Sequence, residues 1–218
     1  MDADFWHERW KARELGFHAG QPNALLVEFF DTLGTAGGWR VFVPLCGKTL
    51  DIGWLLSKGC RVVGVELSET AVQELFDELA VEPESSRQGA LTRYSALDID
   101  IYVGDFFDLT TNTLGPVDAV YDRAALVALP ADMRRRYAAH LATVTAGVNQ
   151  LLLCFEYDQA SMDGPPFAVT GDEVHQLYGA SFGITQLADV EFPGGLKGQT
   201  PAREILWLLK GNSPDASA

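Results

Sequence analysis

Apolar residues in this chain fall into short runs that are separated by segments with helical spacing. The runs predict five strands, which follow one another as Arg40–Leu45, Arg61–Val65, Ile99–Val103, Val117–Tyr121 and Gln150–Tyr157. Between them, apolar positions that recur every three or four residues predict helices at about Asp51–Lys58, after Ser68 and over Ala131–Thr145. Strands that alternate with helices are typical of an α/β fold with a mostly parallel, doubly wound sheet.

The two ends of the chain depart from this alternation. Two further strands are expected near Ile184–Phe192 and Arg203–Leu209 with no helix between them, which predicts an antiparallel hairpin at the sheet. The polar segment from Glu82 to Leu97 is expected to be a loop or a hairpin near the surface. A short helix from Phe5 to Lys11 precedes the first strand. We find no internal repeat or low-complexity segment, so we expect residues 1–218 to form a single domain.

Polar side chains follow three of the predicted parallel strands. They are Glu66, Asp105 and the pair Asp122 and Arg123. Ligands of open α/β sheets bind at the carboxyl ends of the strands. We therefore expect a binding site where these residues converge.

The turn after the first strand limits which ligand this is. Glu66 lies 19 residues after Gly47, and an acid about 20 residues past a glycine turn accepts hydrogen bonds from a ribose. The triplet Gly47-Lys48-Thr49 resembles a P-loop, but the glycine needed five places earlier is Phe42. The turn also lacks the three glycines that bind a pyrophosphate. S-adenosylmethionine, with a ribose and no phosphate, fits the turn best; the alternative is an ordinary strand–helix–strand unit with a solvated glutamate.

Composition and charge exclude several partners. The 218 residues are 47% hydrophobic and 21% charged, with a net charge of −14 and a pI near 4.5. Such an acidic protein is not expected to bind nucleic acid or an anionic membrane. The three cysteines and four histidines show no metal-ligand spacing, so no metal is expected. No apolar stretch is long enough for a signal peptide or a membrane span, and we expect a cytoplasmic protein.

Several ordered motifs resemble the thiopurine S-methyltransferase family. They are Pro44-Leu45-Cys46-Gly47-Lys48, Val63 to Ser68, Phe107-Asp108-Leu109, Asp122 to Ala128 and Gly164-Pro165-Pro166-Phe167, together with Trp6, Trp10, Phe17 and His18 near the amino terminus. The resemblance extends over nearly the whole chain and is closer to a bacterial member than to an animal one. It implies a class I methyltransferase: a Rossmann-like sheet of seven strands with helices on both faces and the last strand antiparallel.

The resemblance also implies roles for individual residues. The cofactor, S-adenosylmethionine, would be bound by Trp10, Leu45, Glu66, Asp105, Phe106 and Arg123. Arg123 would also be the catalytic residue and contact the acceptor, over which Phe17 would stack. Residues 1–21 would form a lid. The alternative for Arg123 is an ion pair with Asp122 or Asp105. Lys197 is a weak candidate for a second cation that faces the substrate.

The implied reaction is methyl transfer to the sulfur of thiopurines and related aromatic or heterocyclic thiols, by in-line displacement without a metal. A heterocyclic thiol is partly ionised at neutral pH and sulfur is a good nucleophile, so no strong base is needed. Methylation of selenium or tellurium compounds, as the natural role in detoxification, is an alternative. A cofactor-binding module without catalysis is another, and the single glycine of the turn disfavours an NAD-dependent dehydrogenase. We expect a monomer.

Overall fold

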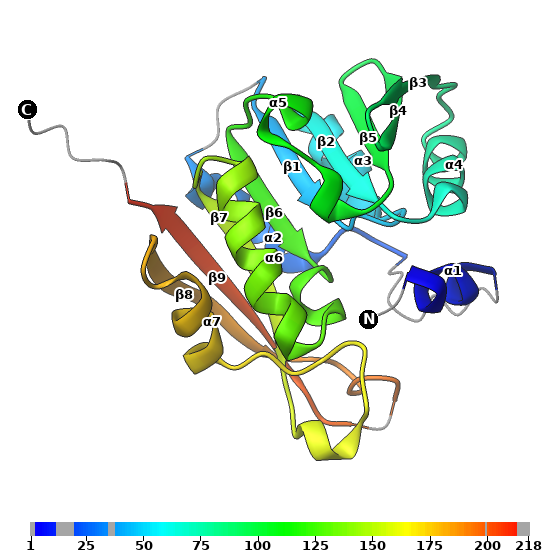
Figure 1. The fold of residues 1–218 in the computed structure, drawn as a ribbon. Helices are drawn as coiled ribbons and strands as arrows, with labels where there is room; N and C mark the ends of the chain where they lie inside the picture. The colour runs from blue at the N-terminus through cyan, green and yellow to red at the C-terminus, as the bar shows by residue number, and fades with distance from the viewer. Residues whose placement is uncertain (1–2, 12–19, 35–37, 199, 213–218) are drawn as a thin grey trace, which may run out of the picture.

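A computed structural model describes residues 3–11, 20–34, 38–198 and 200–212, and all of its named strands lie in one sheet. The strands follow the order β3-β4-β5-β2-β1-β6-β7-β9-β8 across the sheet (Figure 1). Their bounds are β1 Arg40–Pro44, β2 Arg61–Glu66, β3 Glu84–Gln88, β4 Leu91–Ala96, β5 Ile99–Val103, β6 Ala119–Arg123, β7 Gln150–Glu156, β8 Phe182–Glu191 and β9 Arg203–Gly211.

The central part of the sheet is parallel, as the sequence predicts. β5, β2, β1, β6 and β7 pair in parallel, and β9 pairs antiparallel with both β7 and β8. The predicted hairpin near the carboxyl terminus is therefore confirmed, with β9 inserted between β7 and β8.

The predicted number of strands, seven, is wrong, because the sheet has nine strands within the described residues. The two additional strands are the β3–β4 hairpin, which extends the sheet by antiparallel pairing of β4 with β5. Every residue of β3 is exposed. The segment has no alternation of apolar and polar positions, so the hydrophobic pattern that identifies a half-buried strand is missing.

Helices cover both faces of the sheet, and each face has its own apolar core (Figure 1). One core lies beneath α5 (Thr111–Leu114), α6 (Ala131–Val144) and α7 (Gly171–Tyr178). The other lies beneath α2 (Ala24–Phe29), α3 (Leu50–Ser57) and α4 (Glu69–Glu78). Short 3₁₀ turns complete the described fold: η1 (Phe30–Leu33), η2 (Phe106–Asp108), η3 (Leu126–Ala128) and η4 (Gln159–Ser161). Together with the strand order, this is the doubly wound arrangement.

Side-chain caps explain where several of these helices begin. Asn23, Thr49, Ser68 and Thr170 precede α2, α3, α4 and α7, and each accepts a hydrogen bond from a backbone N–H of the first turn. Such a cap satisfies donors that have no partner within the helix. Two of these capped helices, α3 and α4, start directly after β1 and β2, so the caps define the carboxyl edge of the sheet.

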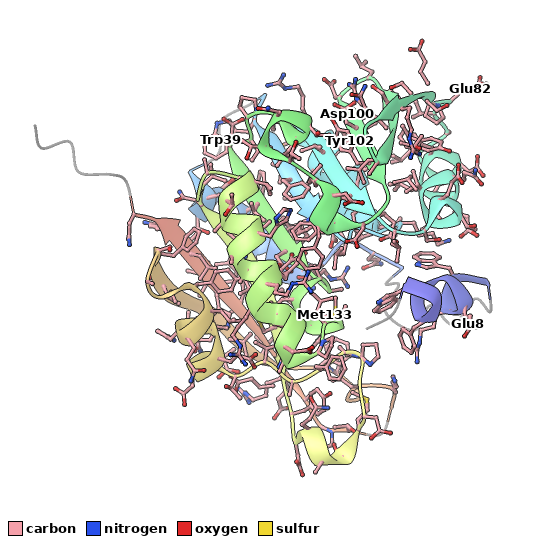
Figure 2. The ribbon with its side chains drawn as sticks, viewed as in Figure 1. Glu8, Trp39, Glu82, Asp100, Tyr102 and Met133 are labelled. Carbon is pink, nitrogen blue, oxygen red and sulfur yellow. The ribbon has the colours of Figure 1, made fainter. Side chains whose placement is uncertain are left out.

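The amino-terminal helix α1 (Ala3–Lys11) lies beyond this carboxyl edge, apart from the helices that cover the two faces (Figure 1). Figure 2 labels Glu8 on α1, and the side chain of Glu8 is exposed. Trp10, on the same helix, is only 6% exposed. Among the described residues, no helix has both the length and the apolar character required to cross a bilayer.

Candidate active site

Glu66 ends β2 at the carboxyl edge of the sheet, beside the turn that follows β1. Its carboxylate is 6% exposed and accepts hydrogen bonds from the backbone N–H of Gly47 (2.8 Å) and of Ser68 (2.9 Å). Burial raises the pKa of this carboxyl, while the backbone donors lower it. A carboxylate oxygen can accept more than one hydrogen bond. The side chain is therefore fixed in position and retains the capacity to accept hydrogen bonds from hydroxyl groups.

Trp10 covers the backbone of this turn. A Cβ added at Gly47 would lie 3.3 Å from Cζ2 of Trp10, and Gly47 has a φ of +52°. Glycine at this position thus permits both the turn and the close approach of the indole. Leu45, two residues earlier, has a φ of 45° and is half-buried against one of the cores. The predicted residues Trp10, Leu45 and Glu66 all lie around the same turn.

Asp105 and Phe106 follow β5, whose last residue pairs with Glu66. Asp105 is exposed and caps η2 by accepting a hydrogen bond from the N–H of Phe107 (2.9 Å). The ring of Phe106 is 3% exposed and packs against Tyr137 and His140 with centroid distances of 4.9 and 5.0 Å. Phe106 is thus a core residue through its side chain, and only its backbone is available for a ligand.

Arg123 ends β6 and forms an ion pair that the sequence does not predict. Its Nη1 donates to Oδ2 of Asp51 (3.1 Å) and to the hydroxyl of Thr49 (3.2 Å). The predicted alternatives for its partner, Asp122 and Asp105, are therefore wrong. Asp122 is the neighbour of Arg123 in the same strand, and successive side chains of a strand point to opposite faces.

The turn after β1 connects the two charged residues. Gly47 donates to Glu66, and Thr49, two residues further on, accepts from Arg123. β2 and β6 flank β1 in the sheet, which separates them by two strand spacings, about 10 Å. One turn thus lies between a carboxylate and a guanidinium at the carboxyl edge of the sheet.

Asp122 faces the opposite core from Arg123. Its side chain is fully buried and accepts hydrogen bonds from the hydroxyl of Tyr137 (2.7 Å) and the N–H of Leu126 (3.2 Å). Burial raises the pKa of this carboxyl to about 6, against the lowering effect of its donors. Asp122 therefore stabilises the turn after Arg123 from the face of the sheet opposite to the Arg123 side chain.

A hollow of about 520 Å³ opens next to this region, at the connection between β8 and β9. Its lining is Glu156, Glu191, Phe192, Gly194, Gly195, Gly198, Pro201, Ala202 and Arg203. The lining includes neither Glu66 nor Arg123, so the hollow is not the predicted cofactor site. Lys197 belongs to the same connection, is exposed and does not line the hollow.

Phe17, the predicted contact of the acceptor, lies outside the described residues, as do residues 1–2 and the rest of residues 12–19 in the predicted lid, residues 1–21. Within the described part of the chain, no group of three or more histidine, cysteine, aspartate or glutamate side chains has the arrangement of a metal site.

Three polar residues beside Arg123 were not identified from the sequence: Asn23, Asp51 and Glu204. Asp51 is fully buried, Glu204 is 8% exposed, and Asn23 donates to both of them. Glu204 follows Arg203 at the charged start of β9, directly before the apolar residues Ile205 to Leu209, so the hydrophobic pattern does not mark it. Asp51 lies in the first turn of a helix, where acids are common, so nothing marked it.

The residues present fit an adenosyl group. A buried, fixed carboxylate with free acceptor capacity at the end of the second strand suits two ribose hydroxyls. The turn with a single glycine does not offer the row of backbone N–H groups that a pyrophosphate requires. The indole of Trp10 lies over the same turn. S-adenosylmethionine is therefore the cofactor that fits these residues.

A known structure has the same architecture. The chain resembles 1,6-didemethyltoxoflavin-N1-methyltransferase from Burkholderia thailandensis, solved with 1,6-didemethyltoxoflavin and S-adenosylhomocysteine bound, with a TM-score of 0.64 and 17% identity over 96% of this chain and 87% of that one. The strand order, the antiparallel β9 and the helices on both faces define the class I methyltransferase fold.

The sequence narrows this class to one family. The family model for thiopurine S-methyltransferase matches residues 1–201. Two relatives named thiopurine S-methyltransferase, from Xanthobacter autotrophicus and Teredinibacter turnerae, are 58% and 50% identical, over 96% and 97% of this chain and 99% of each relative. The chain belongs to the thiopurine S-methyltransferase family, and it is an S-adenosylmethionine-dependent enzyme with a small-molecule substrate.

Proposed function

We propose that this enzyme methylates the sulfur of thiopurines and related aromatic or heterocyclic thiols. The observation that carries the proposal is the turn between Glu66 and Arg123, which contacts both side chains. A carboxylate for the ribose and a cation for the acceptor then lie at two ends of one short segment. The relatives' names support the acceptor class.

Each residue around the turn has a role in this proposal. Glu66 accepts from the ribose hydroxyls, Leu45 and Trp10 bound the pocket, and Asp105 with the backbone of Phe106 lies at the adenine. Trp10 also offers cation–π attraction to a sulfonium, worth about 0.5–2 kcal/mol. S-adenosylmethionine supplies an electrophilic methyl group on a sulfonium that becomes a neutral thioether.

Arg123 is the residue that we assign to the acceptor. Its Nη1 is engaged by Asp51 and Thr49, and its side chain is 16% exposed. A guanidinium has five N–H donors, of which Nε and Nη2 carry three. These donors can stabilise a thiolate or bind a ring nitrogen of a purine. Orientation of a reactive thiol contributes about 7–11 kcal/mol in favourable cases, so the site needs no nucleophile or base of its own.

The proposal includes a cytoplasmic monomer that takes part in detoxification. All three cysteines are buried and form no disulfide, which is the usual state in a reducing compartment. Light scattering coupled to gel filtration measures the monomer directly.

The experiment is methyl transfer from S-adenosylmethionine with a labelled methyl group to 6-mercaptopurine, with selenite and tellurite as parallel acceptors. We expect labelled S-methyl product with the wild type and at least a tenfold lower kcat/KM with Arg123→Met, which removes every donor but keeps much of the apolar stem. Asp100→Asn, which alters an arginine contact at the opposite edge of the sheet, is the matched control and should retain activity. Turnover of tellurite or selenite alone would favour the chalcogen alternative, and cofactor binding without any turnover would favour a binding module.

A further inference from the structure

Asp51 is a buried carboxylate that accepts hydrogen bonds from three residues in two separate parts of the chain, the segment before α2 and strand β6. Its Oδ1 accepts from the backbone N–H of Asn23 (2.7 Å), and its Oδ2 accepts from the hydroxyl of Tyr121 (3.0 Å) and from Nη1 of Arg123 (3.1 Å). The side chain is 0% exposed. A carboxylate is rarely buried to this degree unless it is paired and hydrogen-bonded.

These contacts hold only one end of the guanidinium of Arg123. Thr49 and Asp51, its partners within the described chain, both contact Nη1. Because a guanidinium is rigid and planar, fixing Nη1 between two acceptors restricts the direction of the other edge as well. The donors on Nε and Nη2 remain for a ligand.

Asn23 extends the same network to the segment that enters α2 and to the last strand. Its side-chain oxygen caps α2 through the N–H groups of Leu25 and Leu26, and its Nδ2 donates to Glu204 (3.1 Å). Glu204 is close enough to Arg123 for that guanidinium to lower the pKa of its carboxyl, which burial raises. Asp51 of α3, Tyr121 of β6, Glu204 of β9 and the α2 cap Asn23 thus form one polar network beside Arg123.

We propose that Asp51 is a positioning residue, which holds Nη1 of Arg123 so that the Nε–Nη2 edge presents its donors to the acceptor. The inference rests on the proposed role of Arg123. It adds that orientation of the guanidinium, and not its charge alone, limits recognition of the acceptor. Asp51 itself touches neither the acceptor nor the cofactor in this proposal.

A purely structural role for Asp51 makes a different prediction. A buried ion pair that serves stability alone would lower the unfolding free energy when broken, and any loss of activity would combine independently with a change at Arg123. A positioning role predicts that the effect of Asp51 on the acceptor disappears when Arg123 is absent. A double-mutant cycle separates the two.

The first measurement is binding of 6-mercaptopurine in the presence of S-adenosylhomocysteine, by calorimetry, together with kcat/KM. Asp51→Asn should weaken acceptor affinity and lower kcat/KM by roughly tenfold, because small displacements of a positioning group have effects of this order or larger. The dissociation constant of S-adenosylhomocysteine should change less than twofold. In the Arg123→Met background, Asp51→Asn should cause no further loss.

The second measurement observes the guanidinium itself in ¹H–¹⁵N spectra of the arginine side chains. The Nη1 protons of Arg123, assigned by their absence in Arg123→Met, should be resolved in the wild type because rotation is hindered. Asp51→Asn should average or broaden them. This readout does not depend on any acceptor.

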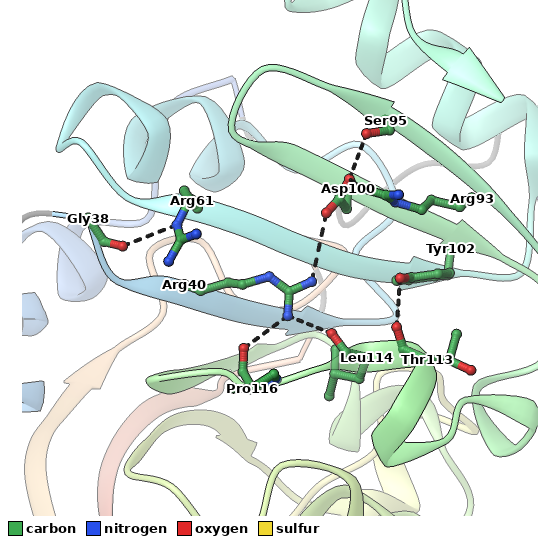
Figure 3. A network of polar contacts seen from close by, with 10 residues as sticks. All are labelled: Gly38, Arg40, Arg61, Arg93, Ser95, Asp100, Tyr102, Thr113, Leu114 and Pro116. Carbon is green, nitrogen blue, oxygen red and sulfur yellow. Dashed lines mark hydrogen bonds and ion pairs between the residues drawn. The ribbon is translucent and has the colours of Figure 1, made fainter. Parts of the chain in front are cut away.

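The matched control is Asp100→Asn at the amino ends of the strands (Figure 3). Asp100 accepts from Nε and Nη2 of Arg93 (3.0 and 2.7 Å) and pairs with Arg40 at 3.7 Å. The variant removes a carboxylate charge from arginines far from the site. It should leave acceptor binding and the resonances of Arg123 unchanged.

The inference would be overturned if the losses of acceptor affinity caused by Asp51→Asn and Arg123→Met were additive in the double mutant. It would also be overturned if the Arg123 resonances were unchanged in Asp51→Asn. If Asp51→Asn does not fold, Asp51→Glu and Thr49→Val replace it; the former retains a carboxylate, and the latter removes the other Nη1 partner. Each should show a smaller loss, about threefold, that is absent in the Arg123→Met background. A wild type that neither binds nor methylates 6-mercaptopurine contradicts the proposed function, while the spectra still decide whether Asp51 orients Arg123.

Discussion

At the scale of single residues, Asp122 links stability to pH. Its folded pKa of about 6 lies above the ordinary value of 3.8, because burial disfavours the charged carboxylate. The folded state therefore binds the proton more tightly than the unfolded state does. The stabilisation that results is complete below pH 3.8 and is lost as the pH rises through 6.

We therefore expect the wild type to gain stability relative to Asp122→Asn as the pH falls. Between pH 8 and pH 5 the gain should be about 1.4 kcal/mol, the worth of one pH unit below the folded pKa. Urea unfolding of both proteins at several pH values measures it. Parallel stability curves for the two proteins would show that Asp122 does not titrate in this range.

Glu66 is the residue whose removal should affect the cofactor most directly. We expect Glu66→Ala to weaken binding of S-adenosylhomocysteine by about 1.5–3 kcal/mol, the usual worth of hydrogen bonds to a charged group. Calorimetry measures the change, and Glu84→Ala on the exposed strand β3 is the control. An unchanged affinity would remove Glu66 from the ribose site.

At the scale of elements, α1 and the turn after β1 form a contact between the amino-terminal segment and the cofactor site. We expect deletion of residues 1–20 to leave the sheet folded but to weaken binding of S-adenosylhomocysteine by about 0.5–2 kcal/mol, because the indole of Trp10 is lost. Calorimetry and thermal unfolding measure the two effects. A deletion after residue 212 is the control, and equal affinities for both truncated proteins would refute a lid.

Strand ends and helix starts were predictable where local chemistry determines them. Ser68 was identified as the cap of α4, and the strand Ile99–Val103 has the predicted bounds. The β3–β4 hairpin could not be assigned as part of the sheet, because it joins the sheet through the pairing of β4 with β5 and its strands have no apolar pattern of their own. Likewise, the spacing from Gly47 predicted the position of Glu66, whereas the pairing of Asp51 with Arg123 joins residues 72 positions apart.

At the scale of the whole molecule, the two edges of the sheet have separate tasks. The amino edge carries polar contacts that join strands to α5 and the segment after it (Figure 3): Nη1 of Arg40 donates to the carbonyl oxygens of Leu114 and Pro116, and nearby the hydroxyl of Tyr102 donates to the backbone carbonyl oxygen of Thr113. Figure 2 shows Asp100 and Tyr102 of β5 close together and away from Glu8 of α1. A strand of five residues separates the edges by about 16 Å.

This separation predicts that stability and binding can be changed independently. Asp100→Asn should lower the free energy of unfolding by about 1–3 kcal/mol, because Arg93 and Ser95 lose their charged acceptor. The affinity for S-adenosylhomocysteine should stay the same. Denaturant unfolding and calorimetry on one preparation test both statements, and a parallel loss of affinity would show that the edges are coupled.

The reversed direction of β9 has a practical consequence for handling the enzyme. The strand begins next to Glu204 at the carboxyl edge and ends at Gly211, whose N–H donates to Asn149 (3.2 Å) just before β7. The chain therefore leaves the sheet on the side opposite α1 (Figure 1). An affinity tag or a surface tether fused after residue 212 would be attached on the side of the sheet opposite Glu66 and Arg123. Immobilised enzyme should therefore exchange cofactor and acceptor freely.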